Sequence, residues 1–382
     1  MGQNFEELLN SAGPIDVKAI RTIKPNGQGI IFVPTNGAGL GHLTRLLAIA
    51  RRIKKRIPDM EIIFFTTSLA KHLIIQEGFV GYYFPTKTLF DPQVTGSQWN
   101  KLFLEQLRQV LKYHNPRMLV FDGTFPYLGL IQSMSQLTQI KKVWLKREGS
   151  KVGDNDVVCN EKEKFFDFLI TPREAGSHMQ EDPDRVYCDP IIYLEKTELL
   201  DRGQLLQKWK VPENSKVVYI QLGAGNINDI TKDIAVLVQT LKRRKDTFII
   251  IGESIIGKDL KIQENNIMVL RDYPNSRFFG AFDLAICACG YNSFHELMHF
   301  GVPSIFIPNR ETKKDDQFGR AMKSVRAHAG MILEDLSPAS VSNVVEIALT
   351  HKDTLSSNAM SLVPNNGADS VAQLIAGHLR KS

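Results

Sequence analysis

The fold is decided by the stretch Leu284-Ala-Ile-Cys-Ala-Cys-Gly-Tyr-Asn-Ser-Phe-His-Glu-Leu-Met-His-Phe-Gly-Val-Pro-Ser-Ile-Phe-Ile-Pro308. Its apolar ends predict two buried strands, and the glycine turn between them leads into a helix that opens on Asn292 and Ser293. The first turn of a helix has unpaired backbone N–H groups and a partial positive charge, so it suits a phosphate. The stretch therefore predicts a strand–helix–strand unit that can bind a nucleotide. Glu296, about one helical turn on, offers a carboxylate to the ribose hydroxyls.

A second glycine loop lies near the other end of the chain. The strand predicted over Gly29–Asn36 runs into Gly37-Ala-Gly-Leu-Gly-His42, and helical apolar spacing follows over Leu43–Ile53. A dinucleotide fingerprint would need glycine in place of His42 and an acidic residue after the next strand, which ends instead in Thr66-Thr67-Ser68. A Walker motif would need a Lys-Ser or Lys-Thr pair after the glycines, and the sequence has none there. The loop therefore favours a phosphate or a sugar over a nicotinamide or ATP.

Strands and helices alternate along both halves of the chain. We expect strands near 30–35, 60–66, 79–84, 118–122, 142–146 and 166–170, and again near 216–222, 248–251, 267–270 and 284–289. Such alternation is typical of parallel sheets joined by crossover helices. It predicts an α/β protein with two doubly wound, Rossmann-like domains.

The pattern breaks near 187–192, and the polar segment 195–210 is expected to be a helix that connects the domains. We therefore predict an N-terminal extension over 1–28, an N-terminal domain over 29–194 and a C-terminal domain over 195–382. Open parallel sheets bind ligands at the carboxyl ends of their strands, so the two domains should face each other across a cleft. The amphipathic tail, 370–379, is placed across their junction.

These motifs and this organisation resemble glycosyltransferases of the GT-B fold, most closely family 28, over most of residues 29–380. The resemblance implies an inverting hexosyltransferase that moves a sugar from a nucleotide-diphosphate donor, a UDP-sugar, to an acceptor hydroxyl. The C-terminal domain would bind the donor and the N-terminal domain the acceptor. Many relatives glycosylate lipid-linked acceptors or cell-envelope glycan precursors. By the same likeness the donor contacts Gly39, Gly41, Gly223, Gly225, Asn226, Gly290, Tyr291, Asn292, Ser293, Glu296, Asp316 and Gln317.

Two residues compete for the role of catalytic base. His42 ends the first glycine loop, and a histidine with an ordinary pKa of about 6.5 can take a proton from a hydroxyl near neutral pH. Asp122 ends a buried strand, where a carboxylate can activate a hydroxyl itself or orient a histidine. A helix cap for His42 and a turn aspartate for Asp122 are the structural alternatives. We favour His42 as the base, with Asp122 next and Glu148 as a weaker third candidate.

Composition limits the partners. Lys+Arg 47 against Asp+Glu 41 gives a net charge of +6, which suits anionic ligands or lipids but is too diffuse for nucleic acid. The four scattered cysteines predict buried thiols in a reduced, cytoplasmic protein. We expect no cofactor and no metal, because adjacent Asp315 and Asp316 diverge and enzymes of this fold use helix dipoles on the diphosphate. The basic run Arg51–Arg56 and the apolar segment Phe79–Phe90 leave peripheral contact with the inner face of a membrane open.

Two other functions remain open. A non-hydrolysing UDP-sugar 2-epimerase shares the fold and the donor, although a loop that closes in Gly-His fits it less well. A nucleotide-sugar-binding protein without catalysis would keep the donor site alone. The acceptor is not named by any motif in this sequence.

Overall fold

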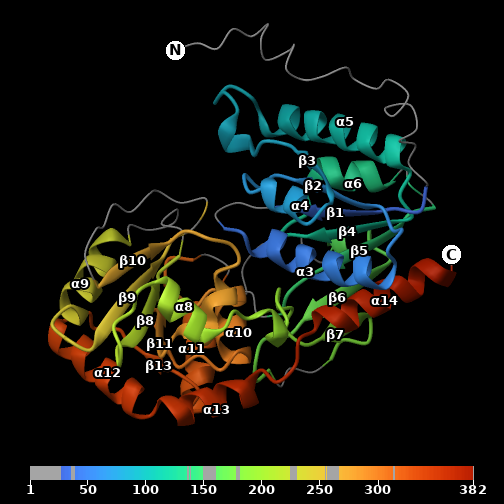
Figure 1. Cartoon of the computed structure of the whole chain (residues 1–382). Helices are drawn as coiled ribbons and strands as arrows, with labels where there is room; N and C mark the ends of the chain where they lie inside the picture. Colours follow the sequence, from blue (N-terminus) through green and yellow to red (C-terminus); the bar gives the residue numbers. More distant parts are fainter. Residues whose placement is uncertain are drawn as a thin grey trace, which may run out of the picture.

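Two α/β domains lie side by side in the computed structural model, with α5 (Gly96–His114) in the N-terminal domain and α9 (Thr231–Leu241) in the C-terminal domain (Figure 1). The structure describes residues 27–35, 39–135, 137, 139–148, 161–177, 181–223, 230–253, 255, 266–312 and 315–381. The extension that we predict over 1–28 lies almost entirely outside these residues.

Within the described residues, the N-terminal domain has a seven-stranded parallel sheet in the order β3-β2-β1-β4-β5-β6-β7. Its strands are β1 Ile30–Pro34, β2 Ile62–Thr66, β3 Val80–Tyr83, β4 Met118–Asp122, β5 Lys141–Leu145, β6 Phe168–Pro172 and β7 Arg185–Cys188. Its helices are α3 Gly41–Arg56, α4 His72–Gln76, η1 Lys87–Leu89, α5 Gly96–His114 and α6 Leu128–Ser135.

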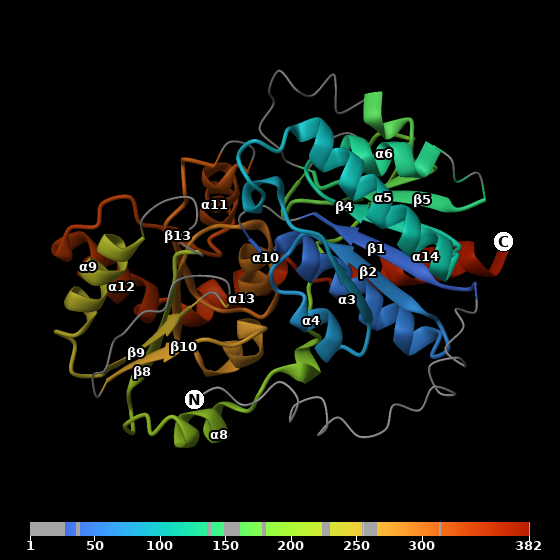
Figure 2. The ribbon, with the colours of Figure 1, turned by 90° about the horizontal axis from the view of Figure 1, so that it is seen from above.

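Both faces of this sheet are covered, which explains why its central strands are apolar throughout rather than alternating. Successive side chains of a strand point to opposite faces. Ile30 and Phe32 of β1 therefore pack in the core with α3. Ile31 and Val33 pack in the opposite core with α5 and α6. Figure 2 shows α5 and α6 together on one side of β1 and β2, with α3 on the other.

The C-terminal domain repeats this plan with a six-stranded parallel sheet, in the order β10-β9-β8-β11-β12-β13 over the described residues. Its strands are β8 Lys216–Gln221, β9 Thr247–Gly252, β10 Ile267–Leu270, β11 Leu284–Cys287, β12 Ser304–Phe306 and β13 Met331–Ile332. The helical segments are η2 Lys196–Glu198, α8 Arg202–Lys208, α9 Thr231–Leu241, η3 Asn275–Ala281, α10 Tyr291–His299, α11 Gln317–Arg326, α12 Pro338–Thr350, α13 Lys352–Leu362 and α14 Ala368–Lys381.

The predicted fold class is confirmed, and the structure differs from the sequence prediction at a few elements. The single helix expected over 195–210 is two short pieces, η2 and α8. Leu199 after η2 is extended, and Asp201 caps α8 by accepting from Gln204 N at 2.9 Å. The strands β7 and β13 were not anticipated. β7 is partly exposed and β13 has two residues, so neither has an apolar run long enough to predict.

The last helix crosses back to the first domain. Val371, Ala372 and Ile375 of α14 join the core that contains Leu43 and Leu46 of α3. The boundary predicted at 195 therefore leaves one helix of the C-terminal range on the N-terminal domain, as Figure 1 shows. We expect this amphipathic tail across the domain junction, whereas its apolar face packs on α3 of the N-terminal domain.

The topology positions the ligand site. In each sheet the strand order reverses direction at one point, between β1 and β4 and between β8 and β11. Parallel sheets bind ligands beside such a point, at the carboxyl ends of the strands. Among the described residues, no helix is both long and apolar enough to cross a bilayer.

Candidate active site

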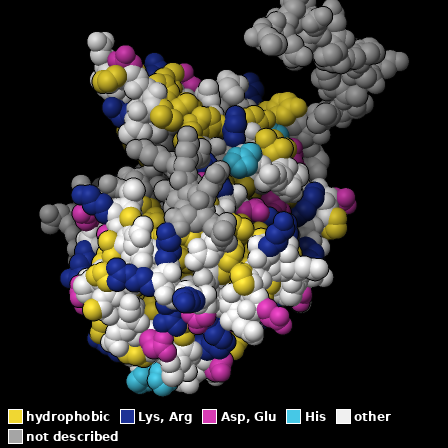
Figure 3. All heavy atoms as spheres, turned by 60° about the vertical axis from the view of Figure 1, so that its left-hand side comes forward, with side chains coloured by type: hydrophobic (Ala, Val, Ile, Leu, Met, Phe, Trp, Pro, Cys, Tyr) yellow, Lys and Arg dark blue, Asp and Glu magenta, His cyan; other side chains and the backbone are white. Residues whose placement is uncertain are grey.

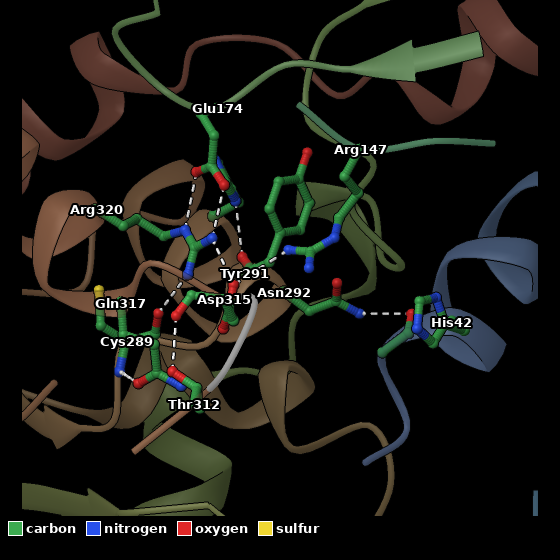
Figure 4. Close-up of polar contacts among 12 residues, drawn as sticks. His42, Arg147, Glu174, Cys289, Tyr291, Asn292, Thr312, Asp315, Gln317 and Arg320 are labelled. Atoms are coloured by element: carbon green, nitrogen blue, oxygen red, sulfur yellow. Dashed lines mark hydrogen bonds and ion pairs between the residues drawn. The ribbon is translucent and has the colours of Figure 1, made fainter. Parts of the chain in front are cut away.

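A cleft of about 540 Å³ lies between the two reversal points. Both domains line it, the N-terminal one through the start of α3 and the C-terminal one through the start of α10. Asn292 joins the two helices, because its Nδ2 donates to Gly41 O at 3.2 Å and its Oδ1 accepts from Arg45 Nη1 at 3.1 Å. Figure 4 shows the Asn292 side chain directed from α10 toward His42. The glycine loops and the predicted base thus share one cavity.

On the N-terminal side, His42 and Asp122 form a hydrogen-bonded pair. His42 Nδ1 lies 2.6 Å from Asp122 Oδ1, with His42 at the start of α3 and Asp122 at the end of β4. The guanidinium of Arg45 donates to both carboxylate oxygens, from Nε at 2.9 Å and from Nη2 at 2.8 Å. Asp122 is 1% exposed, whereas the His42 side chain is 21% exposed and faces the cleft. Asp122 is therefore placed to orient His42 rather than to meet a substrate.

The pKa values of Asp122 and His42 agree with an ionised carboxylate that orients a neutral imidazole. Burial alone would raise the pKa of Asp122, but Arg45 and His42 outweigh it and hold that pKa below its usual value. Burial lowers the pKa of His42, and attraction to Asp122 opposes this only in part. At neutral pH the imidazole is then neutral. Arg45 Nη2 also lies 2.8 Å from His42 Nδ1, but an ionised carboxylate can only accept, so the 2.6 Å contact with Asp122 places the hydrogen on Nδ1. This tautomer leaves the lone pair on Nε2, where it can accept a proton.

On the C-terminal side, the start of α10 is open to a ligand. Its cap residue, Gly290, provides no side chain to bond the first N–H groups. Among the described residues, no atom lies within 4 Å of a Cβ added at Gly290, Gly39 or Gly223, so these residues leave the glycine backbone accessible. Gly223 also has a φ of +102°, which other residues rarely adopt. These positions let a phosphate approach the main chain closely.

Glu296 lies one turn further along α10 and lines the same cleft. Its only hydrogen-bond donor among the described residues is the Ser276 hydroxyl, at 3.2 Å. Burial raises the pKa of Glu296 to about 7, and the hydrogen bond from Ser276 opposes this only in part. A carboxylate buried with so little compensation is costly by itself, and two ribose hydroxyls would supply the missing donors.

The remaining predicted residues are distributed unevenly. Most of them line the cleft, from the glycine loops and from the first turns of α3, α10 and α11. These residues are Gly39, Gly41, His42, Gly223, Gly290, Tyr291, Asn292, Ser293, Glu296 and Gln317. Gln317 Oε1 accepts from Cys289 N and Asn309 N, both at 3.1 Å, so its amide group is held firmly at the wall. Gly225 and Asn226 lie outside the described residues.

Asp316 is where the structure differs from our prediction. Its side chain is exposed and caps α11 by accepting from Gly319 N at 3.0 Å, and it does not line the cleft. Its neighbour Asp315 lines the cleft instead. Adjacent side chains in this turn point in different directions, which sequence spacing alone could not resolve.

Sequence reasoning missed a group of buried charges beside the site. Arg320 on α11 is 2% exposed and donates to both oxygens of Glu174, from Nε at 2.8 Å and from Nη2 at 2.6 Å. Glu174 follows β6, so this pair joins the two domains. Arg147 extends from the end of β5 toward Tyr291 (Figure 4). Arg45 could have been detected, because it stands on an otherwise apolar helix face and a buried arginine needs a partner.

The neighbouring histidine has a structural role. His295 Nδ1 lies 2.7 Å from Tyr291 O, and its Nε2 accepts from Ala175 N at 3.0 Å. Burial is the main reason that its pKa falls to about 4. A neutral ring with Nδ1–H satisfies both bonds, so His295 joins α10 to the N-terminal domain.

Comparisons with known proteins agree with this geometry. Residues 222–375 match the model of the glycosyltransferase family 28 C-terminal domain. The chain is 25% identical over 365 residues to the UDP-N-acetylglucosamine–N-acetylmuramyl-(pentapeptide) pyrophosphoryl-undecaprenol N-acetylglucosamine transferase of Acetivibrio thermocellus, covering 89% of this chain and 96% of the relative. The chain is also 26% identical to the transferase of the same name from Clostridioides difficile, covering 85% of this chain and 82% of that relative.

Solved structures show the same fold at lower identity. MurG of Acinetobacter baumannii superposes with a TM-score of 0.62 at 13% identity, over 92% of this chain and 99% of that one. Together, the family model, the relatives and the fold identify the chain as a family 28-like glycosyltransferase of the GT-B fold.

Proposed function

We propose that this glycosyltransferase transfers a sugar with inversion from a UDP-sugar to the hydroxyl of an acceptor. The acceptor oxygen attacks the anomeric carbon while His42 Nε2 takes the hydroxyl proton, and Asp122 stabilises the imidazolium that forms. The bond from the anomeric carbon to the diphosphate oxygen breaks, and its electron pair leaves with the diphosphate. The first turn of α10 stabilises that negative charge.

The observation that carries this proposal is the pairing of two sites across one cleft. On one wall is a neutral histidine whose Nδ1 is held 2.6 Å from a buried carboxylate. On the other wall are a helix start without a side-chain cap and Glu296, whose carboxylate has one hydroxyl donor within the part of the chain that the structure describes. A nucleotide bound through its ribose at Glu296 and its diphosphate at Gly290 would present its sugar toward His42.

We further propose that the reaction needs no divalent metal. The start of α10 and the glycine loops supply N–H donors and a partial positive charge for the diphosphate. Asp315 is already engaged by Arg320, whose Nη2 lies 2.8 Å from Asp315 Oδ1. Asp316 is used as a helix cap. Neither carboxylate is then free to act as a metal ligand toward the donor.

For the acceptor we propose a lipid-linked glycan precursor, reached at the cytoplasmic face of a membrane. The relative from A. thermocellus acts, by its name, on a pyrophosphoryl-undecaprenol. Leu69, Ile75 and Leu89 of the N-terminal domain are 62%, 62% and 58% exposed. Lys71 and Lys87, each two positions from one of these leucines in the sequence, are exposed as well. Figure 3 shows hydrophobic side chains gathered on this domain. Apolar surface beside lysines suits an anionic bilayer.

Vesicle sedimentation tests the membrane contact. A Leu69→Ser/Leu89→Ser double variant should lose binding to vesicles that contain anionic phospholipid. Ile347→Ser, which changes an exposed apolar residue of the C-terminal domain, should bind as the unaltered protein does. Equal binding by all three proteins would exclude this surface as the contact.

The reaction itself is tested with a panel of UDP-sugars, each incubated with and without acceptor and followed by mass spectrometry. Transfer requires an acceptor, 2-epimerisation proceeds without one, and a binding protein gives neither product. A thermal-shift screen selects the donor first. If no UDP-sugar stabilises the protein, the donor site is assigned wrongly.

A further inference from the structure

Three arginines surround the ring of Tyr291, and among the described residues one of them, Arg147, has only a long contact with a partner. The guanidinium carbons of Arg45, Arg147 and Arg320 lie 5.5, 4.7 and 5.5 Å from the ring centroid. Tyr291 itself is fixed, because its hydroxyl donates to Arg173 O at 2.8 Å. The ring is thus a rigid platform at the start of α10, against which the three cations pack.

Arg45 and Arg320 are fully engaged in protein contacts. Arg45 binds both oxygens of Asp122 and also Asn292. Arg320 binds both oxygens of Glu174, and its Nη1 donates to Cys289 O at 2.7 Å. Both side chains are 2% exposed or less. They hold the two domains together and have no group left for a ligand.

Arg147 is held less firmly by protein contacts than the other two arginines. Its one hydrogen bond with a described residue is a long contact of 3.4 Å from Nη1 to Asp315 Oδ1. That oxygen already accepts from Arg320 at 2.8 Å. The Arg147 side chain is 23% exposed and lines the cleft together with Gly290 and Ser293. In Figure 4 its guanidinium lies beside Tyr291 and Asn292, at the first turn of α10.

The surroundings make this guanidinium short of negative charge. Burial is the main reason that the pKa of Arg147 lies below its usual value, and Arg45 and Arg320 lower it further. Asp315 opposes this but is shared with Arg320. An anion bound in the cleft would restore the balance, and a guanidinium binds phosphate oxygens through two parallel N–H groups.

We propose that Arg147 binds the diphosphate of the nucleotide donor from the acceptor-side domain. This inference rests on the proposed function and adds a residue to it. Because Arg147 belongs to the N-terminal domain, the diphosphate would be held between an arginine of one domain and the start of α10 of the other. As the bond to the sugar breaks, the charge that develops on the leaving oxygen is met by a cation already in place. Donor binding would then also favour the closed arrangement of the domains.

Calorimetry with uridine and with UDP tests the proposal, because the two ligands differ in the diphosphate alone. Arg147→Gln should weaken UDP by about 10- to 100-fold, the usual worth of a hydrogen bond to a charged group, and leave uridine unchanged. Arg147→Lys keeps the positive charge but lacks the two parallel N–H groups of the guanidinium, so it should give a smaller loss of UDP affinity. Arg173→Gln is the matched control: Arg173 follows β6, stacks on Tyr187 and does not line the cleft, so both affinities should stay the same.

The outcomes separate this inference from the function beneath it. If the unaltered protein binds neither uridine nor UDP, the proposed function fails and this inference fails with it. If it binds both, and Arg147→Gln lowers both affinities equally, Arg147 supports the cleft without contacting the diphosphate. If both Arg147 variants keep the full affinity for UDP, the donor diphosphate is not its ligand, and an acceptor phosphate would be the anion instead. Either of the last two results overturns the inference and leaves the donor site standing.

Discussion

Replacing Glu296 by Gln should make the unliganded protein more stable while weakening its binding of UDP. The carboxylate is largely buried, and its hydrogen-bond donor among the described residues is the Ser276 hydroxyl at 3.2 Å. Its charge is therefore poorly compensated until a ribose is present. A glutamine has nearly the same shape and no charge to bury.

The raised pKa of Glu296 sets the size of the expected gain in stability. A pKa of about 7 in place of the ordinary 4.5 corresponds to about 3 kcal/mol as an upper bound. The side chain is partly exposed, so a gain of about 1–3 kcal/mol is expected, or roughly 2–4 °C in Tm for each kcal/mol.

The direction in which stability changes with pH follows from how many protons the folded and unfolded states bind. Between pH 4.5 and about 7 the folded state keeps a proton that the unfolded state has lost, so wild-type stability falls as pH rises through this window. Gln does not titrate. The variant should match the wild type near pH 4.5 and exceed it fully above pH 7, as measured by unfolding at several pH values.

The affinity for UDP, measured as a function of pH, is the second quantity that tests the role of Glu296. Ribose hydroxyls need the ionised carboxylate, so the wild-type affinity for UDP should rise with pH up to about 7, by about tenfold per pH unit. The variant should bind weakly at every pH. A variant that is no more stable at pH 8 than the wild type, or that binds UDP equally well, would refute the reasoning.

Three further predictions concern the base and the metal. His42→Ala should lower turnover by about 10²–10⁴-fold without weakening UDP, and the wild-type rate should rise with pH and level off above the lowered pKa of His42, an inflection that the variant lacks. If His42→Ala keeps most of the turnover and Asp122→Asn abolishes it, the roles are reversed, and if both stay active Glu148 is next. Asp122→Asn should cost about 3–5 kcal/mol in urea unfolding, because Arg45 loses its buried partner, whereas His42→Ala should cost much less; equal losses would contradict the ion pair. Treatment with EDTA should leave activity intact, and restoration of a lost activity by Mg²⁺ or Mn²⁺ would disprove the metal-free mechanism.

Local sequence signals determined most of the fold. β4 and β10 have the bounds that we predict, and α10 begins one residue before the predicted Asn292, because each signal is contained within its own segment. Helix α10 begins after Gly290 and ends before Gly301-Val302-Pro303, and glycine and proline punctuate helices for reasons of backbone geometry alone. The glycine loops could be placed at a shared cleft because parallel strands present their carboxyl ends at one edge. Glu296 and His42 could therefore be selected from the sequence.

The partners of the buried charges were decided only by the tertiary structure. Arg45 meets Asp122 across 77 residues of sequence, and Arg320 meets Glu174 across 146. A local pattern can show that a charged side chain lies on an apolar face, but it does not contain the residue that neutralises it. For Arg45 that residue is fixed by how α3 packs on its own sheet, and for Arg320 by how the two domains pack against each other. The same packing brought Arg147 beside Tyr291 and placed α14 on the first domain, since the free energy of burial depends on surfaces that come together only when the whole chain has folded.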